Sequence, residues 1–203
     1  RDVLGSRGLG DVYKRQDGTG TKNTNQQTLE ANRVSVIDLG SVPKSATGLT
    51  ISATEPVTAA AKVTNDGDGD QADFALVNAS VPMNVSAMAV PDHATAQVSV
   101  TNTSDDDRTA TLTSYNGDGD IVDQNDLTIR AGASTTVELA DINDGDVAAV
   151  SLADPDQSMV WNIRVSQKDV SDAKLAGVSI ISATDLKEAR EQVWSNQNMT
   201  IVR

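Results

Sequence analysis

The chain has 203 residues, with 16 basic and 29 acidic side chains and a formal net charge of −13. Cysteine is absent and histidine occurs once, which excludes disulfides, thiolate metal sites and a site built from several histidines of one chain. The acidic surface repels phosphates, so nucleic acid is not an expected partner. No apolar run approaches the roughly 20 residues that are needed to span a bilayer.

The N-terminal segment differs from the rest of the sequence. Residues 1–16, RDVLGSRGLGDVYKRQ, hold four basic and two acidic residues and have no helical or alternating periodicity. The string is similar to the in-frame translation of a sequencing adapter, and a basic linker is the alternative. Residues 17–30 are a polar linker pattern. We therefore expect residues 1–32 to be an adapter-like segment and disordered linker, and residues 1–30 to lack regular structure.

From residue 33 onward the pattern favours short β-strands. The apolar runs are rich in Val, Ile and Thr and recur about every ten residues, which is typical of an all-β sandwich. We predict an all-β fold of antiparallel, immunoglobulin-like β-sandwich modules. The predicted strands cover residues 33–39, 49–53, 57–63, 74–76, 85–90, 96–100, 109–113, 127–129, 135–139, 147–152, 159–165 and 178–181.

One segment near the C-terminus has a helical pattern. In residues 185–193, DLKEAREQV, Asp185 can cap a helix and Glu188 completes a capping box. Leu186, Ala189 and Val193 fall on one face. We predict a short helix that seals one end of the sandwich, and a helix presented to a partner is the alternative.

Two parts of the sequence are similar at an offset of about 100 residues, the size of one immunoglobulin-like sandwich. Residues 34–66 correspond to residues 136–169, so that Leu49–Val63 and Ala148–Val165 should form equivalent hairpins. We therefore predict a partial module, the C-terminal half of a sandwich, over residues 33–84 and a complete module over residues 85–203.

The first half of the second module, residues 85–133, has no counterpart before residue 33 in this interpretation. The missing half-module is then expected upstream of the chain. An incomplete sandwich exposes strand edges, so residues 33–80 should be less well packed than residues 85–182.

Three phrases carry a resemblance to a known family. They are the paired strands ISATEPVTAAAKV and VSLADPDQSMVWNIRV, the segment VTNTSDDDRTATLTSYNGDGDIV, and the segment IRAGASTTVELAD. Over roughly residues 33–182 the chain resembles a family of uncharacterised secreted or membrane-anchored actinobacterial proteins, catalogued as a domain of unknown function. The resemblance implies an exported, envelope-associated protein, and it implies no activity and no functional residues.

The segment from Ser114 to Ile129 resembles the calcium loop of a dockerin. With Ser114 at loop position one, oxygen-bearing side chains fall near the positions that calcium requires, and Gly119 falls at position six. The candidate calcium ligands are Asn116, Asp118, Asp120 and Asp123. Position one lacks an aspartate and the flanks are strand-like, so a plain β-hairpin connection is the favoured interpretation.

The other candidate functional residues have less support from the sequence. The run NDGDGD at residues 65–70 has the aspartate spacing of a calcium loop, but it lacks the required glycine and glutamate and predicts a hairpin turn. His93 is the one possible histidine base and has no identifiable partner. Trp161 alternates with apolar neighbours and should lie in the core, whereas Trp194 could pack or bind carbohydrate.

Two classes of function follow from the sequence. The first is a non-catalytic extracellular or cell-envelope β-sandwich module with a spacer, scaffold or adhesion role. The second is an accessory module that binds calcium or carbohydrate. We do not expect an enzyme; no cofactor is expected beyond that calcium, and the partner is unknown, with a cell-envelope component or a carbohydrate as the candidates.

Overall fold

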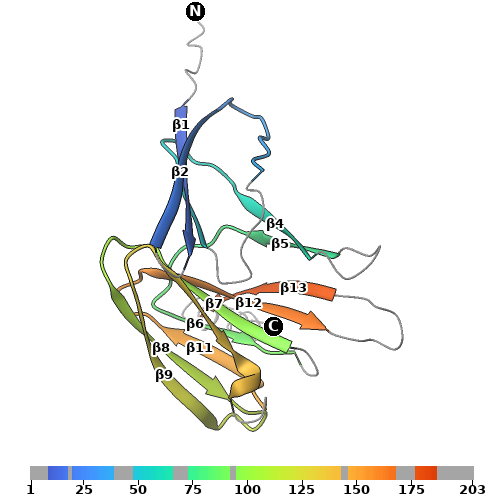
Figure 1. The fold of residues 1–203 in the computed structure, drawn as a ribbon. Helices are drawn as coiled ribbons and strands as arrows, with labels where there is room; N and C mark the ends of the chain where they lie inside the picture. The colour runs from blue at the N-terminus through green and yellow to red at the C-terminus, as the bar shows by residue number, and fades with distance from the viewer. Residues whose placement is uncertain are drawn as a thin grey trace, which may run out of the picture.

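The computed structural model describes residues 9–17, 20–38, 48–65, 73–91, 95–142, 146–167 and 177–186. The regular structure in these ranges is almost entirely antiparallel β-sheet, with one short 3-10 turn (Figure 1). The predicted all-β class and sandwich architecture are therefore confirmed. In the described residues, no helix is both long and apolar enough to cross a membrane.

Two sheets form the sandwich, with strands between Val85 and Asp185. The first sheet has the order β10-β7-β12-β13 and the second has the order β14-β6-β11-β8-β9. The first contains β7 (Thr95–Asn102), β10 (Ser134–Glu138), β12 (Met159–Gln167) and β13 (Gly177–Ser182). The second contains β6 (Val85–Ala89), β8 (Arg108–Tyr115), β9 (Ile121–Ile129), β11 (Ala149–Ala153) and β14 (Thr184–Asp185), and the 3-10 turn η1 (Leu139–Asp141) follows β10.

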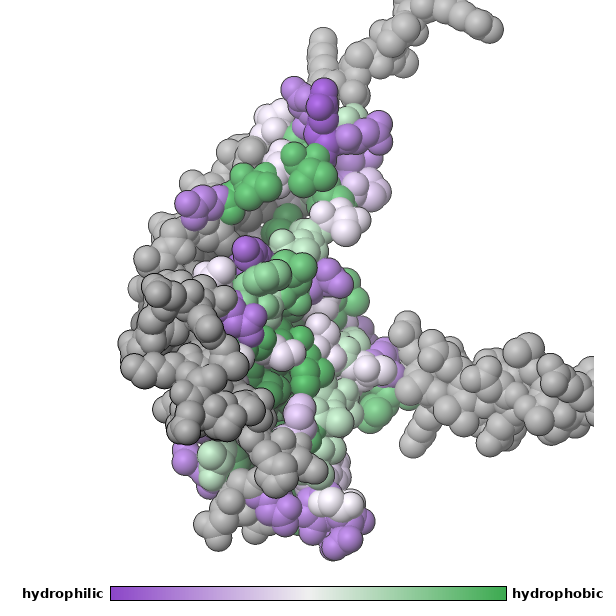
Figure 2. All heavy atoms as spheres, turned by 90° about the vertical axis from the view of Figure 1, so that its right-hand side faces the viewer, coloured by the Kyte–Doolittle hydropathy of each residue, from purple (hydrophilic) through white to green (hydrophobic). Residues whose placement is uncertain are grey.

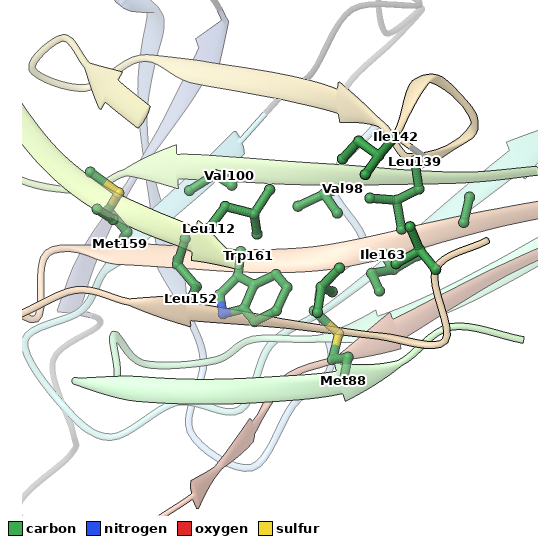
Figure 3. Close-up of a cluster of buried hydrophobic side chains, with 14 of the residues drawn as sticks. Met88, Val98, Val100, Leu112, Leu139, Ile142, Leu152, Met159, Trp161 and Ile163 are labelled. Atoms are coloured by element: carbon green, nitrogen blue, oxygen red, sulfur yellow. The ribbon is translucent and has the colours of Figure 1, made fainter. Parts of the chain in front are cut away.

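The core forms where the inner faces of these two sheets meet. Side chains alternate between the two faces of a strand, and β12 shows this alternation most fully: Met159, Trp161, Ile163 and Val165 are buried. Their neighbours across the core come from the other sheet, as Figure 3 shows for Trp161 beside Leu112 and Leu152. The remaining members of the cluster include Met88, Val98, Val100, Leu139, Ile142 and Val150.

The N-terminal part forms further β-structure. The strands β1 (Leu9–Asp17), β2 (Gly20–Leu29) and β3 (Gly48–Ser52) make a sheet of order β2-β1-β3, and β4 (Ala60–Asn65) pairs with β5 (Asp73–Asn78). The expectation that residues 1–30 lack regular structure is therefore wrong for β1 and β2. Backbone pairing of these two strands needs no apolar alternation, which is the signal that the sequence lacks here.

The β2-β1-β3 sheet contacts the sandwich through a close backbone approach at Gly48. This glycine is buried, and a Cβ atom built on it would lie 2.5 Å from both Oγ1 and Cγ2 of Thr101 and 3.0 Å from Oγ of Ser134. The Thr101 and Ser134 hydroxyl groups are themselves joined by a buried hydrogen bond of 2.8 Å. Because this pair has little freedom to move, the contact requires glycine.

The β4–β5 hairpin contacts the sandwich beside β13 (Figure 1). Asp73 Oδ2 accepts a hydrogen bond of 2.8 Å from the backbone N–H of Val178, and Asp73 Oδ1 accepts one of 2.7 Å from Phe74. These two hydrogen bonds stabilise the carboxylate and lower the pKa of Asp73 below its ordinary value of 3.8. Asp73 therefore satisfies a backbone N–H group at the edge of β13.

Packing is uneven along the chain. Among the residues from 28 onward whose burial the structure describes, Ala75 is the one buried apolar side chain that precedes residue 85, whereas the sandwich core holds most of the others. This agrees with the expectation that residues 33–80 are less well packed. Figure 2 shows apolar side chains gathered down the middle of one face of the molecule, between hydrophilic ends.

Three details differ from the expectation drawn from the sequence. Neither Leu49–Val63 nor Ala148–Val165 is a hairpin, because β3 and β4 lie in different sheets and so do β11 and β12. Residues 33–38 form no strand despite their alternation. Of the predicted helix at 185–193, Asp185 lies in β14 and pairs with Ser86 instead of capping the helix. Leu186 is helical, and the residues from 187 on lie outside the described ranges.

The hydrogen bond to Asp73 gives a pH-dependent contact. The pKa of Asp73 is lowered in the folded chain. The contribution of its ionised carboxylate to folding stability is therefore fully present above pH 3.8, and it is lost as the pH falls through the lowered pKa. We predict that Asp73→Asn abolishes the low-pH change in the exchange rate of the Val178 amide, measured by hydrogen exchange. Asp118→Asn, at an exposed turn, is the control. An unchanged pH profile in Asp73→Asn would contradict the assignment.

Candidate functional site

The predicted calcium loop is the turn between β8 and β9. Asn116 Oδ1 accepts hydrogen bonds from the backbone N–H groups of Asp118, at 3.1 Å, and Asp120, at 2.9 Å. Gly119 has φ +87°, and its N–H donates to the Asn116 carbonyl at 3.1 Å. The amide oxygen of Asn116 is therefore used to hold the turn, and Asp118 and Asp120 are exposed.

Asp123 faces a different environment from the other three predicted ligands. It pairs with Ser114 across the β8–β9 ladder, and Asn125 pairs with Leu112. Since Ser114 and Leu112 are buried, Asp123 and Asn125 share the inner face of the sandwich at its β9 edge. Within the described residues, no three or more Asp, Glu, His or Cys side chains are grouped as a metal site.

A depression of about 300 Å³ opens at this edge, between β9 and η1. Its lining consists of Val122, Asp123, Asn125, Asp141 and Ile142. The Asn125 side-chain amide donates to Asp123 Oδ2, which leaves the other oxygen of that carboxylate available. Neither carboxylate forms an ion pair with a described residue, so no cation of the described part of the chain offsets these two negative charges.

Ser114 adds a buried polar group opposite Asp123 in the β8–β9 ladder. The residue is 1% exposed and its Oγ has no hydrogen-bond partner among the described residues. A buried hydroxyl group without a partner is costly and needs an explanation, such as a bound water or ligand. Because Ser114 lies directly opposite Asp123 on the same face, the hydroxyl group and the carboxylate are neighbours.

Asn102 organises the loops at one end of the sandwich. The residue is fully buried, and its Nδ2 donates to the carbonyl groups of Asp106 at 2.8 Å, Ile129 at 2.9 Å and Arg130 at 3.2 Å. Its Oδ1 accepts from the N–H of Ser104 at 3.0 Å and from its hydroxyl group at 2.8 Å. One side chain thus connects the β7–β8 loop to the turn after β9.

Asp154 has the same role in the turn between β11 and β12. Its fully buried carboxylate accepts from the N–H groups of Ser158 and Met159 at 2.6 and 2.7 Å. The Ser158 carbonyl in turn accepts from both the N–H and the hydroxyl group of Thr103, each at 2.8 Å. These buried polar atoms are satisfied by backbone partners, which is the pattern of a structural network rather than of a catalytic one.

The remaining predicted residues divide into two groups. Trp161 lies in the core as predicted, 4% exposed, and its Nε1 donates to Ser86 Oγ at 2.7 Å. His93, Trp194 and residues 66–70 lie outside the described ranges. No sequence pattern marks Asn102 or Asp154, because their partners are backbone groups that the fold brings close.

A family of unknown function, DUF5719, matches residues 12–140. The chain belongs to this family. The DUF5719 match covers β2, the depression residues of β9 and most of the Asn102 network, and ends within η1. No curated protein and no solved structure matches the chain.

Two asparagines allow a matched test of the structural network. Asn102→Ala would leave several buried backbone groups unsatisfied, and we predict a loss of unfolding free energy on the order of 3 kcal/mol. Asn116→Ala removes an exposed turn acceptor, and we predict a loss of about 1 kcal/mol. Urea denaturation measures both. Equal losses would show that the buried network contributes no more than an exposed turn.

Proposed function

We propose that this DUF5719 chain is a non-catalytic module of the immunoglobulin-like β-sandwich type, placed outside the cell or in the cell envelope, where it serves as a spacer, scaffold or adhesion element. The resemblance to exported actinobacterial envelope proteins supports the location, and an actinobacterial origin is part of the proposal. The strongly acidic composition, with a net charge of −13, also suits a soluble exposed surface.

The observation that carries the proposal is that buried polar side chains bind the backbone at one end of the sandwich. Asn102 and Asp154 are both fully buried, and their polar atoms bind backbone groups at one end of the sandwich. The Gly48 contact of the N-terminal sheet lies against Thr101 and Ser134, at this same end. The polar network therefore stiffens the surface on which the preceding part of the chain packs, as a spacer or scaffold needs.

Location is tested by protease treatment of intact cells that produce the native full-length protein. We predict that external protease removes a tag inserted within residues 168–176, while a cytoplasmic marker protein stays intact. Cell lysis before treatment is the control for cleavability. Protection of the tag in intact cells, with cleavage after lysis, would place the module inside the cell and contradict the proposal.

A second function, binding of a calcium ion, is favoured by the depression beside η1. Its lining supplies two carboxylates, from Asp123 and Asp141, and an amide oxygen from Asn125. Ser114, opposite Asp123 in the β8–β9 ladder, adds a buried hydroxyl group that has no hydrogen-bond partner among the described residues. Calcium prefers such oxygen ligands and completes its shell with water. Of the four residues predicted from the sequence, this proposal keeps Asp123 alone, because Asn116 is held by the turn.

Calcium titration followed by thermal melting tests this second function. We predict that calcium raises the melting temperature of the unmodified chain and that Asp123→Asn or Asp141→Asn removes the shift. Asp118→Asn, which lies in the turn outside the depression, should keep it. If calcium and chelator give the same melting curve, the depression does not bind calcium. Loss of the shift in Asp118→Asn alone would instead support the loop predicted from the sequence.

A further inference from the structure

The turn between β8 and β9 contains the pair Asn116–Gly117. In the full sequence, Asn116 is the one asparagine that a glycine follows. The side-chain amide of an asparagine can be attacked by the backbone nitrogen of the next residue, and glycine obstructs that attack least because it has no Cβ atom. A Cβ atom built on Gly117 would meet no heavy atom of the described chain within 4 Å apart from its chain neighbours. The Gly117 nitrogen is therefore sterically accessible.

The hydrogen bonds of this turn leave the Gly117 nitrogen available. Gly117 is exposed, and its N–H donates no hydrogen bond within the described part of the chain. The next three N–H groups are all engaged. Those of Asp118 and Asp120 donate to Asn116 Oδ1, and that of Gly119 donates to the Asn116 carbonyl. Of the four backbone N–H groups after Asn116, the one adjacent to its side chain is thus the one open to solvent.

The amide oxygen of Asn116 is bound by two backbone donors. The N–H groups of Asp118 and Asp120 lie 3.1 and 2.9 Å from Oδ1. Attack on Cγ turns this oxygen into an oxyanion, and fixed donors at about 2.7–3.1 Å stabilise such a charge more than they stabilise a neutral carbonyl group. The nitrogen that would leave, Nδ2, forms no hydrogen bond with a described residue. The turn thus favours the charge that develops during the attack.

We propose that Asn116 is a self-modification site, at which the folded turn promotes conversion of the asparagine to aspartate and isoaspartate. The backbone nitrogen of Gly117 loses its proton to hydroxide and bonds to Cγ of Asn116. The Cγ–Nδ2 bond breaks, and Nδ2 takes up a proton from water and leaves as ammonia. Water then opens the five-membered imide at either carbonyl: its hydroxyl group goes to the carbonyl carbon and its proton to the Gly117 nitrogen or to water. Hydrolysis at one carbonyl gives aspartate, and hydrolysis at the other gives isoaspartate.

The two products act differently on the β8–β9 hairpin. Aspartate keeps an oxygen in the place of Asn116 Oδ1, and a carboxylate accepts N–H hydrogen bonds more strongly than an amide does. Isoaspartate routes the main chain through the former side-chain carbonyl, so the chain gains a methylene group before Gly117 and that oxygen no longer closes the turn. Because β9 is an edge strand that pairs with β8, isoaspartate would loosen this edge. The inference does not depend on the location of the protein.

Other candidate pairs lack this arrangement. Asp118–Gly119 lies in the same turn, but the Gly119 nitrogen is engaged by a hydrogen bond of 3.1 Å to a carbonyl group, and an ionised carboxylate is a weaker electrophile than an amide. Asn102 is fully buried, and its Nδ2 donates to three carbonyl groups. The next N–H, that of Thr103, donates to a carbonyl group at 2.8 Å. The reactive combination of free nitrogen and bound oxygen is therefore particular to Asn116.

Incubation of the chain of residues 1–203 at mildly alkaline pH tests this proposal. Trypsin then releases residues 109–130, which contain both Asn116 and the exposed Asn125 as an internal control. Mass spectrometry of this peptide measures the replacement of each amide by a carboxyl group, and fragmentation separates isoaspartate from aspartate. We expect Asn116 to convert about tenfold or more faster than Asn125, which Asp126 follows and which lacks the two donors. Equal rates at the two asparagines would overturn the proposal.

Two further measurements separate the role of the turn from that of the sequence. Gly117→Ala fits the open space at this position, so it should leave the melting curve unchanged and slow the conversion of Asn116 severalfold. An unchanged rate in Gly117→Ala would contradict attack by this nitrogen. In the urea-unfolded chain the two donors to Oδ1 are absent, and conversion should be slower than in the folded chain at the same pH. Faster conversion in the unfolded chain would show that the turn protects Asn116, and the proposal would be wrong.

Discussion

The sandwich depends on the burial of one face of β12. Met159, Trp161 and Ile163 alternate along this strand and are each less than 5% exposed, and they fill the space between the two sheets. The strand can do this because β7 and β13 pair with its two edges and satisfy its backbone groups. Removal of either neighbour would expose the edge and loosen the face that β11 and β8 cover.

Polar contacts determine the structure at the ends of the sandwich, whereas apolar contacts determine its middle. At the end that carries the β7–β8 loop, buried polar side chains do the packing, and each is matched to backbone groups that are distant in the sequence, as Asn102 is to Ile129. Such contacts are directional, so they fix loop conformations that apolar packing would leave variable. At the β9 edge this matching is incomplete: Ser114 Oγ has no hydrogen-bond partner in the part of the chain that the structure describes, and two carboxylates line an open depression.

The strands of the sandwich could be predicted from the sequence because the cause is local. Alternation along a strand of nine residues, as in β12, is visible without any knowledge of its neighbours. The same reasoning failed where neighbours decide the outcome. Residues 33–38 alternate but form no strand, and β1 and β2 pair without alternating. Of the candidate ligands, Asn116 was correctly placed in a turn, but its hydrogen bonds to that turn could not be read from spacing alone.

Gly48 sets how force would pass through the molecule. The absence of a side chain lets the backbone of β3 lie directly on the Thr101–Ser134 pair, so no flexible group intervenes between the N-terminal sheet and the sandwich. A pull or a torque on the N-terminal sheet would therefore reach β7 and β10 without a compliant hinge. A side chain at this position would act as a wedge, and the two parts would then bend independently under load.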